Sequence, residues 1–267
     1  MTANQSPVQS VLAMNTRFLN NHLLIRQCIL AGSAVIGLAW LWSGTERPVQ
    51  GVGQPDPIAV NIVRQYVAAE QRPRYQQLLQ EFGRNKELPE GYELQALLAL
   101  SHYPELRETR IRFIMDDVNI PLSSRPYWAT LYRSAAQRTY LVVIDSRRDD
   151  DRAELLLRNQ PFNAQTGVIG HELAHTVYYL DRSFFDILAD AACQLSSCRI
   201  GFERDTDQRT VDYGLGWQRY DHSLFLRTSF GADPNAAANP GSAYMGPREL
   251  LDLMESNPAY QATLAQH

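Results

Sequence analysis

The sequence lacks any block of like charge. Its 25 Lys and Arg are interspersed with 29 Asp and Glu, which gives a net charge of −4 at pH 7. Because proteins that bind nucleic acids carry a clustered basic stripe or patch, we expect no nucleic-acid partner. The chain also lacks an internal repeat of about 20–50 residues. With 267 residues, of which 45% are hydrophobic, it is long enough for one substantial core.

Cysteine is scarce, with three in the chain. Cys28 lies in an apolar run, and the other two, Cys193 and Cys198, form a C-x4-C. A pair this isolated is not a zinc site of its own. Two interpretations of the pair stay open: a disulfide that closes a small loop at the end of a helix, and two reduced thiols in a core.

Charged residues are absent from residues 28–42. As a helix, this run covers about 22 Å, and uncharged flanking residues extend it towards the roughly 30 Å of a hydrocarbon layer. Arginines precede the run, and Trp40 and Trp42 end it, as is typical of a membrane interface. Residues 28–44 therefore predict a membrane signal-anchor, with a cleaved signal peptide and a buried core helix as alternatives.

The predicted anchor sets an expected domain organisation and location. Residues 1–27 would be an N-terminal cytoplasmic segment. Residues 45–57 contain Gly and Pro repeatedly and predict a flexible linker, so that residues 58–267 form the folded domain. Because the positive flank stays in the cytoplasm, we expect a single-pass membrane protein whose folded domain is periplasmic or extracellular.

The chain has few histidines, but two of them stand in the sequence H-E-x-x-H at residues 171–175. Residues four apart share one face of a helix, so the imidazoles of His171 and His175 can reach one metal ion. Glu172 then lies near a metal-bound water, where a zinc hydrolase needs a general base. Asn163 is the predicted N-cap of this helix, which continues to Leu180. The alternative is a surface helix that carries these residues by chance.

A catalytic zinc ion generally has three protein ligands and a water, so a third ligand is needed. Asp181 stands where metzincins place theirs, but Tyr178 occupies the position of the glycine that turns the chain, so the helix would continue and point Asp181 elsewhere. Glu203 is the better candidate, because Asp207 follows it by one turn on the same face in an E-x-x-x-D. The alternative for Glu203 and Asp207 is a solvated helix face.

With H-E-x-x-H on one helix and E-x-x-x-D on a following one, the sequence resembles the glutamate-zincins, or gluzincins, over roughly residues 109–220. The resemblance implies a zinc metallopeptidase in which His171, His175 and Glu203 bind Zn²⁺. It also implies that Asp207 accepts a hydrogen bond from the far nitrogen of His171 and fixes its tautomer. Residues 45–108 match no pattern of this family.

The periodicity predicts an α+β fold, and the resemblance implies that this fold is zincin-like. A small, mostly antiparallel sheet would pack on the active-site helix, with further helices on either side. Strands are expected at residues 111–115, 127–132 and 139–144, the last two as a hairpin. Helices are expected at residues 58–69, 73–82 and 94–100, at 183–195 as a buried helix capped by Ser183, from 202 past 217 with an interruption at Gly214 and Gly216, and at 247–254.

The expected function is hydrolysis of peptide bonds, with Glu172 as general base. A peptide or protein substrate would bind as an added strand, so residues 139–144 or their partner strand should lie beside the zinc site. The source of an oxyanion donor stays open among Tyr213, Tyr220, His222 and Tyr244. Two alternatives remain: an amidase that acts on cell-wall peptides, and a non-catalytic zinc-stabilised domain that binds a partner.

Overall fold

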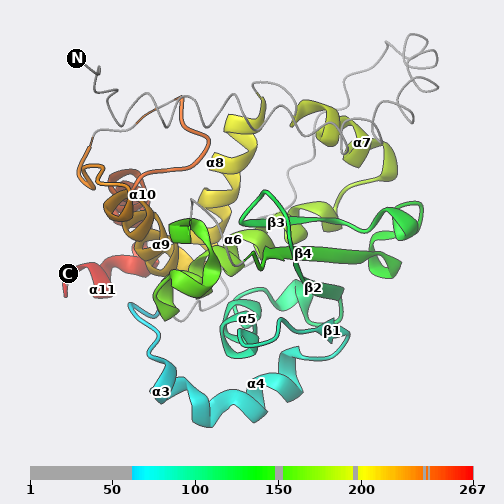
Figure 1. Cartoon of the computed structure of the whole chain (residues 1–267), viewed down its shortest axis with the longest axis horizontal. Helices are drawn as coiled ribbons and strands as arrows, with labels where there is room; N and C mark the ends of the chain where they lie inside the picture. Colours follow the sequence, from blue (N-terminus) through cyan, green and yellow to red (C-terminus); the bar gives the residue numbers. More distant parts are fainter. Residues whose placement is uncertain (1–61, 148–152, 195–197, 237–238, 240, 267) are drawn as a thin grey trace. The chain divides into compact units, whose positions relative to one another are not determined.

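A four-stranded sheet forms the middle of the fold (Figure 1). The computed structural model describes residues 62–147, 153–194, 198–236, 239 and 241–266, which all belong to the unit Pro57–His267. The strands are β1 (Lys86–Glu87), β2 (Arg110–Asp116), β3 (Leu122–Pro126) and β4 (Thr139–Asp145), in the order β1-β2-β4-β3. β2 runs parallel to β1 and β4, and β3 runs antiparallel to β4.

The predicted α+β class is confirmed, but the prediction of a mostly antiparallel sheet is wrong because the sheet is mixed. β3 does not pair with β2, the strand before it. It pairs with the far side of β4, so β4 is inserted between β2 and β3 and runs parallel to β2. β4 is therefore paired along both edges, and it is buried from Tyr140 to Asp145.

β3 and β4 form the predicted hairpin, but its first strand is Leu122–Pro126 instead of the expected residues 127–132. β3 ends at Pro126, and Trp128–Thr130, which we expected in a strand, is a 3-10 turn. The large side chains at this turn made the segment resemble a strand, but they point to solvent: Trp128 is 49% and Tyr132 is 72% exposed. β3 is an edge strand, which tolerates the missing N–H of Pro126.

Helices make up most of the remaining described residues. They are α3 (Ala68–Gln71), α4 (Tyr75–Phe82), α5 (Glu93–Leu100), α6 (Phe162–Leu180), α7 (Phe184–Cys193), α8 (Cys198–Thr210), α9 (Gly216–Ser229), α10 (Pro247–Ser256) and α11 (Gln261–Leu264). The long helix α6, which carries H-E-x-x-H, packs against α5, α9 and β3. It is therefore enclosed by helices and by the sheet edge, and most of its residues are buried.

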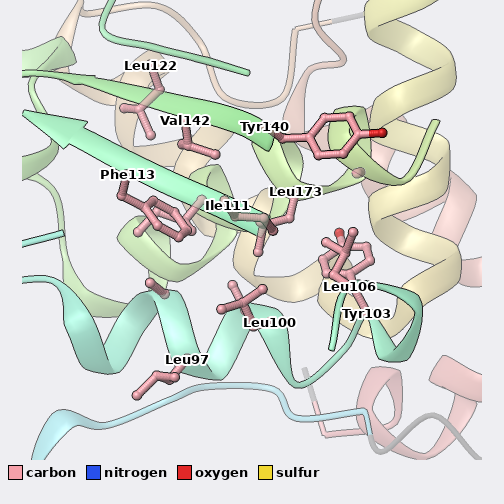
Figure 2. Packing of buried hydrophobic residues seen from close by; sticks show 14 of the residues in the cluster. Leu97, Leu100, Tyr103, Leu106, Ile111, Phe113, Leu122, Tyr140, Val142 and Leu173 are labelled. Carbon is pink, nitrogen blue, oxygen red and sulfur yellow. The ribbon is translucent and has the colours of Figure 1, made fainter. Parts of the chain in front are cut away.

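The main core lies between α5, the sheet and α6 (Figure 2). Leu100 of α5 lies below the strands, where Ile111 and Phe113 of β2 point towards it, whereas Leu97, also buried, is on the side of α5 away from the strands. Leu173 of α6 is fully buried in the same cluster. Because Leu173 stands between Glu172 and His175, this packing fixes the rotation of α6 and hence the direction of the imidazoles of His171 and His175.

Three helix predictions need correction. The helix expected at residues 58–69 is mostly absent from the described part, because residues 62–67 are not helical and the helix α3 begins at Ala68. Residues 58–61 lie outside the described part. Asn163 is not the N-cap of α6, because the helix begins at Phe162; its side chain instead accepts a hydrogen bond from Tyr66 N at 2.8 Å. Helix α7 has the predicted Ser183 cap, but Ile187 is its one buried residue and Phe185 is 73% exposed.

The interruption predicted near Gly214 is confirmed and separates α8 from α9. Residues Val211–Leu215 form a π-helical turn in which Gly214 has a φ of 87°, in the left-handed region that glycine adopts without strain. At the other end of α8, Cys193 and Cys198 form a disulfide, which decides between the two interpretations of this pair. The first residue of α8 is therefore joined covalently to the last residue of α7.

The predicted single-pass membrane localisation is contradicted. Within the described part of the chain, no helix is both long and apolar enough to cross a membrane. The longest described helix, α6, has the 19 residues that a span would need, but it carries His171, Glu172 and His175 in its interior. The expected anchor at residues 28–44, with the segment 1–27 and the linker 45–57, lies outside the described residues.

Gly167 allows α6 and α9 to approach closely. A Cβ atom at Gly167 would lie 2.1 Å from the backbone oxygen of Gln218 in α9. We expect Gly167→Ala to lower the free energy of unfolding by about 1–3 kcal/mol or more, because the contact is with backbone and cannot be relieved by a rotamer change. Urea denaturation of the two proteins measures this difference.

Gly201→Ala in α8 is the matched control for this prediction. A Cβ atom at Gly201 would meet nothing within 4 Å, so alanine should leave stability unchanged or raise it by up to about 1 kcal/mol through its higher helix propensity. If the two variants had equal stability, close packing of α6 on α9 would not be the reason for glycine at 167.

Candidate metal centre

The three predicted ligands come together between α6 and α8. Nε2 of His171 and Nε2 of His175 each lie 3.2 Å from Oε2 of Glu203. One ligand atom from each residue lies within 4.8 Å of the other two, and all three residues are buried. This group could hold a metal ion. Asp181, the other candidate, is the C-cap of α6 and does not belong to it.

The far nitrogens of the two imidazoles face oxygen atoms. Nδ1 of His171 lies 2.8 Å from Oδ1 of Asp207, and Nδ1 of His175 lies 3.2 Å from Oγ1 of Thr206. With a metal ion bound, a proton on each Nδ1 would face these oxygens, and the lone pair of each Nε2 would be left for the metal. Two lone pairs and a carboxylate then converge, which is a donor set that a catalytic zinc ion uses.

Asp207 is held by more than one element. Its carboxylate accepts hydrogen bonds from Nε of Arg219 in α9 at 2.6 Å and from the backbone N–H of Met245 at 2.9 Å. The side chain of Asp207 is fully buried, and Glu203 is 8% exposed. These values exclude a solvated helix face for both residues. Arg219 was not found from the sequence, because it follows the π-helical turn, which changes the rotation of α9 relative to α8.

The electrostatics of the group follow from burial and from opposite charges. Burial alone would lower the pKa of His171, but the carboxylates of Asp207 and Glu203 outweigh burial and raise it to about 9. Burial would raise the pKa of Glu203, yet the imidazoles of His171 and His175 hold the pKa of this carboxyl well below its usual range. Glu203 is therefore ionised at neutral pH and carries the negative charge that a metal cation needs.

Glu172 lies beside this group without belonging to it. Its side chain is 6% exposed, and burial raises its pKa even though the neighbouring imidazoles of His175 and His171 act against this shift. A carboxyl whose pKa moves up towards neutrality is better matched to accept and release a proton than a solvated one. Glu172 is thus a buried carboxyl that neighbours the three residues of the candidate metal group.

Of the four residues considered as oxyanion donors, Tyr244 approaches the ligands. Its ring centroid lies 5.8 Å from that of His171, and 44% of the residue is exposed. Of the other three, the Tyr213 hydroxyl donates to Glu105 and Tyr220 packs on Trp217. Nδ1 of His222 lies 2.8 Å from Oε1 of Gln160, although its imidazole also interacts electrostatically with His171.

Strand β3 runs along the same stretch of α6. The hydroxyls of Ser124 and Thr176 lie 2.9 Å apart, and Thr176 directly follows His175. β3 is the partner of β4 and an edge of the sheet, so the structure places the expected partner strand next to the ligand helix. A separate hollow of about 540 Å³ lies at the N-terminal end of α6, near Tyr66 and Asp221, and is not lined by any of the three ligands.

No protein-family model, curated protein or solved structure matches this chain. What the molecule does must therefore be argued from the geometry of the site and its surroundings.

Proposed function

We propose that the protein is a zinc metallopeptidase of the glutamate-zincin type, with a zincin-like arrangement of sheet edge and ligand helix. One observation carries the proposal: two Nε2 atoms and the Glu203 carboxylate converge within 4.8 Å, next to the buried Glu172. Two histidines and a glutamate, with one position left for water, are typical of catalytic zinc. When bound, zinc polarises a substrate carbonyl and makes a water molecule more acidic.

The residues around the zinc site would carry the proton transfers. Glu172 takes a proton from the attacking water and passes it to the leaving amine, so it acts as a base and then as an acid. Tyr244 is the residue best situated to donate a hydrogen bond to the oxygen on which negative charge develops. Both roles need side chains that do not bind the metal themselves, and neither residue belongs to the ligand group.

The substrate class proposed is an extended polypeptide. An edge strand has free N–H and C=O groups that pair with an extended backbone, and β3 offers this edge next to His175. The chain leaving β3 carries Tyr127 and Trp128, which are 37% and 49% exposed. Exposed aromatic rings favour apolar side chains, so segments of unfolded proteins fit this surface better than charged peptides.

Metal removal tests the proposal. The purified full-length chain should contain about one zinc ion per molecule by elemental analysis. It should cleave an unfolded protein, lose this activity after dialysis against a chelator, and regain it when zinc is added. Cleavage that persists after complete metal removal would contradict the proposal, and so would the absence of bound metal. Purified cell wall as a second substrate separates the peptidase from the amidase.

The non-catalytic alternative requires a different number of protein ligands at the site. A structural zinc ion is closed by four protein ligands, whereas the group among the described residues contains three. A purely structural site also has no use for a buried carboxyl beside it. We therefore favour the enzyme.

A further inference from the structure

Helix α8 contacts both ligand histidines through four side chains. Glu203 faces both Nε2 atoms, and Asp207 faces Nδ1 of His171. The remaining two contact His175: the ring of Phe202 stacks on it at 4.9 Å with an interplanar angle of 19°, and Oγ1 of Thr206 lies 3.2 Å from Nδ1. Each histidine thus has a partner for its far nitrogen on the same helix, a carboxylate for one and a hydroxyl for the other.

The hydrogen bonds of Thr206 determine which way the His175 contact runs. Its hydroxyl donates its single proton to the backbone oxygen of Phe202 at 2.8 Å. Towards His175, Thr206 can therefore only accept, which requires a proton on Nδ1. This tautomer leaves the lone pair on Nε2, the atom that faces Glu203. Thr206 is fully buried, so water cannot easily take the place of its hydroxyl.

We infer that Thr206 is a positioning residue, which fixes the tautomer and orientation of His175 for metal binding while Phe202 fixes the plane of the ring. The inference rests on the proposed zinc site. Partners of this kind orient metal ligands, and their loss typically lowers metal affinity by about 10–100-fold. Sequence reasoning did not single out Thr206, because a threonine within a helix usually bonds back to its own helix, as Thr206 also does.

Two substitutions at Thr206 test the inference. Thr206→Val keeps the shape of the side chain and removes the hydroxyl, whereas Thr206→Ser keeps the hydroxyl. In full-length protein, competition with a chromophoric chelator should show zinc affinity about 10–100-fold lower for Thr206→Val and restored towards the wild-type value for Thr206→Ser. In zinc-bound protein, the Nδ1–H of His175 should exchange slowly with solvent in wild type and faster in Thr206→Val.

Thr210→Val is the matched control. Thr210 lies one turn further along α8, is fully buried and donates to the Thr206 backbone oxygen. The zinc affinity of Thr210→Val should be within about threefold of the wild-type value. Equal zinc affinity in Thr206→Val and wild type would overturn the inference, as would equal losses in the Thr206→Val and Thr210→Val variants. If wild-type protein bound no zinc at all, the proposed metallopeptidase itself would be wrong, and the inference with it.

Discussion

Glu172→Gln should lower kcat for peptide cleavage by about 10²–10⁴-fold and leave the zinc content unchanged. The substitution keeps the size of a buried side chain but removes the group that accepts the proton. His171, His175 and Glu203 remain, so the metal group is intact. Steady-state kinetics on an unfolded protein substrate, together with elemental analysis of the same sample, measure both quantities.

Glu105→Gln provides the same chemical change away from the site. Glu105 accepts a hydrogen bond from the Tyr213 hydroxyl and has no contact with the ligand group. This control should keep kcat within a few-fold of wild type. Loss of zinc in Glu172→Gln would show that Glu172 is a ligand, and wild-type turnover in that variant would exclude it as the base.

Asp207→Ala should be the most destabilising of the substitutions considered. It leaves Arg219, which is 3% exposed, as a buried charge without its carboxylate, and it removes the acceptor for Met245 N–H. Breaking a buried pair in this way costs about 3–5 kcal/mol. Zinc affinity should also fall by about 10–100-fold, because His171 loses the partner of Nδ1. Urea denaturation without zinc and chelator competition measure the two effects.

A second substitution separates stability from metal binding. Arg219→Met in the Asp207→Ala background removes the unpaired charge and should recover much of the stability, yet zinc affinity should stay low. Asp252→Ala is the surface control: Asp252 is half exposed and pairs with Arg248, so its loss should cost about 0–1 kcal/mol. Recovery of affinity in the double variant would mean that Asp207 acts on stability alone.

The sequence predicted the parts of the site that depend on local spacing. His171, Glu172 and His175 lie on one helix, where the positions of side chains follow from the helical repeat. Glu203 and Asp207 followed from a resemblance in spacing on a second helix. Thr206 and Arg219 could not be found in this way, because their roles depend on how α8 is rotated against α6 and on the π-helical turn that precedes α9.

The fold, like the site, was predictable where it depends on local patterns and not where it depends on long-range packing. Alternation identified β2, and a run of β-forming residues identified β4. Pairing between strands is long-range and neither pattern contains it, so the parallel pairing of β2 with β4 was missed. Apolar composition also predicted burial for α7, although Phe184 and Phe185 pack on each other at the surface. The composition of a segment indicates how much apolar surface it could bury, but its contacts with the rest of the chain determine whether that surface is buried.

Helix α8 contacts His171 and His175 of α6 through residues 202, 203, 206 and 207, all within two turns. The candidate centre therefore consists largely of two short patterns, H-E-x-x-H and F-E-x-x-T-D, which the packing of α8 on α6 brings together. Searching sequences for the two patterns together can thus find proteins built on the same centre, even where overall similarity has been lost.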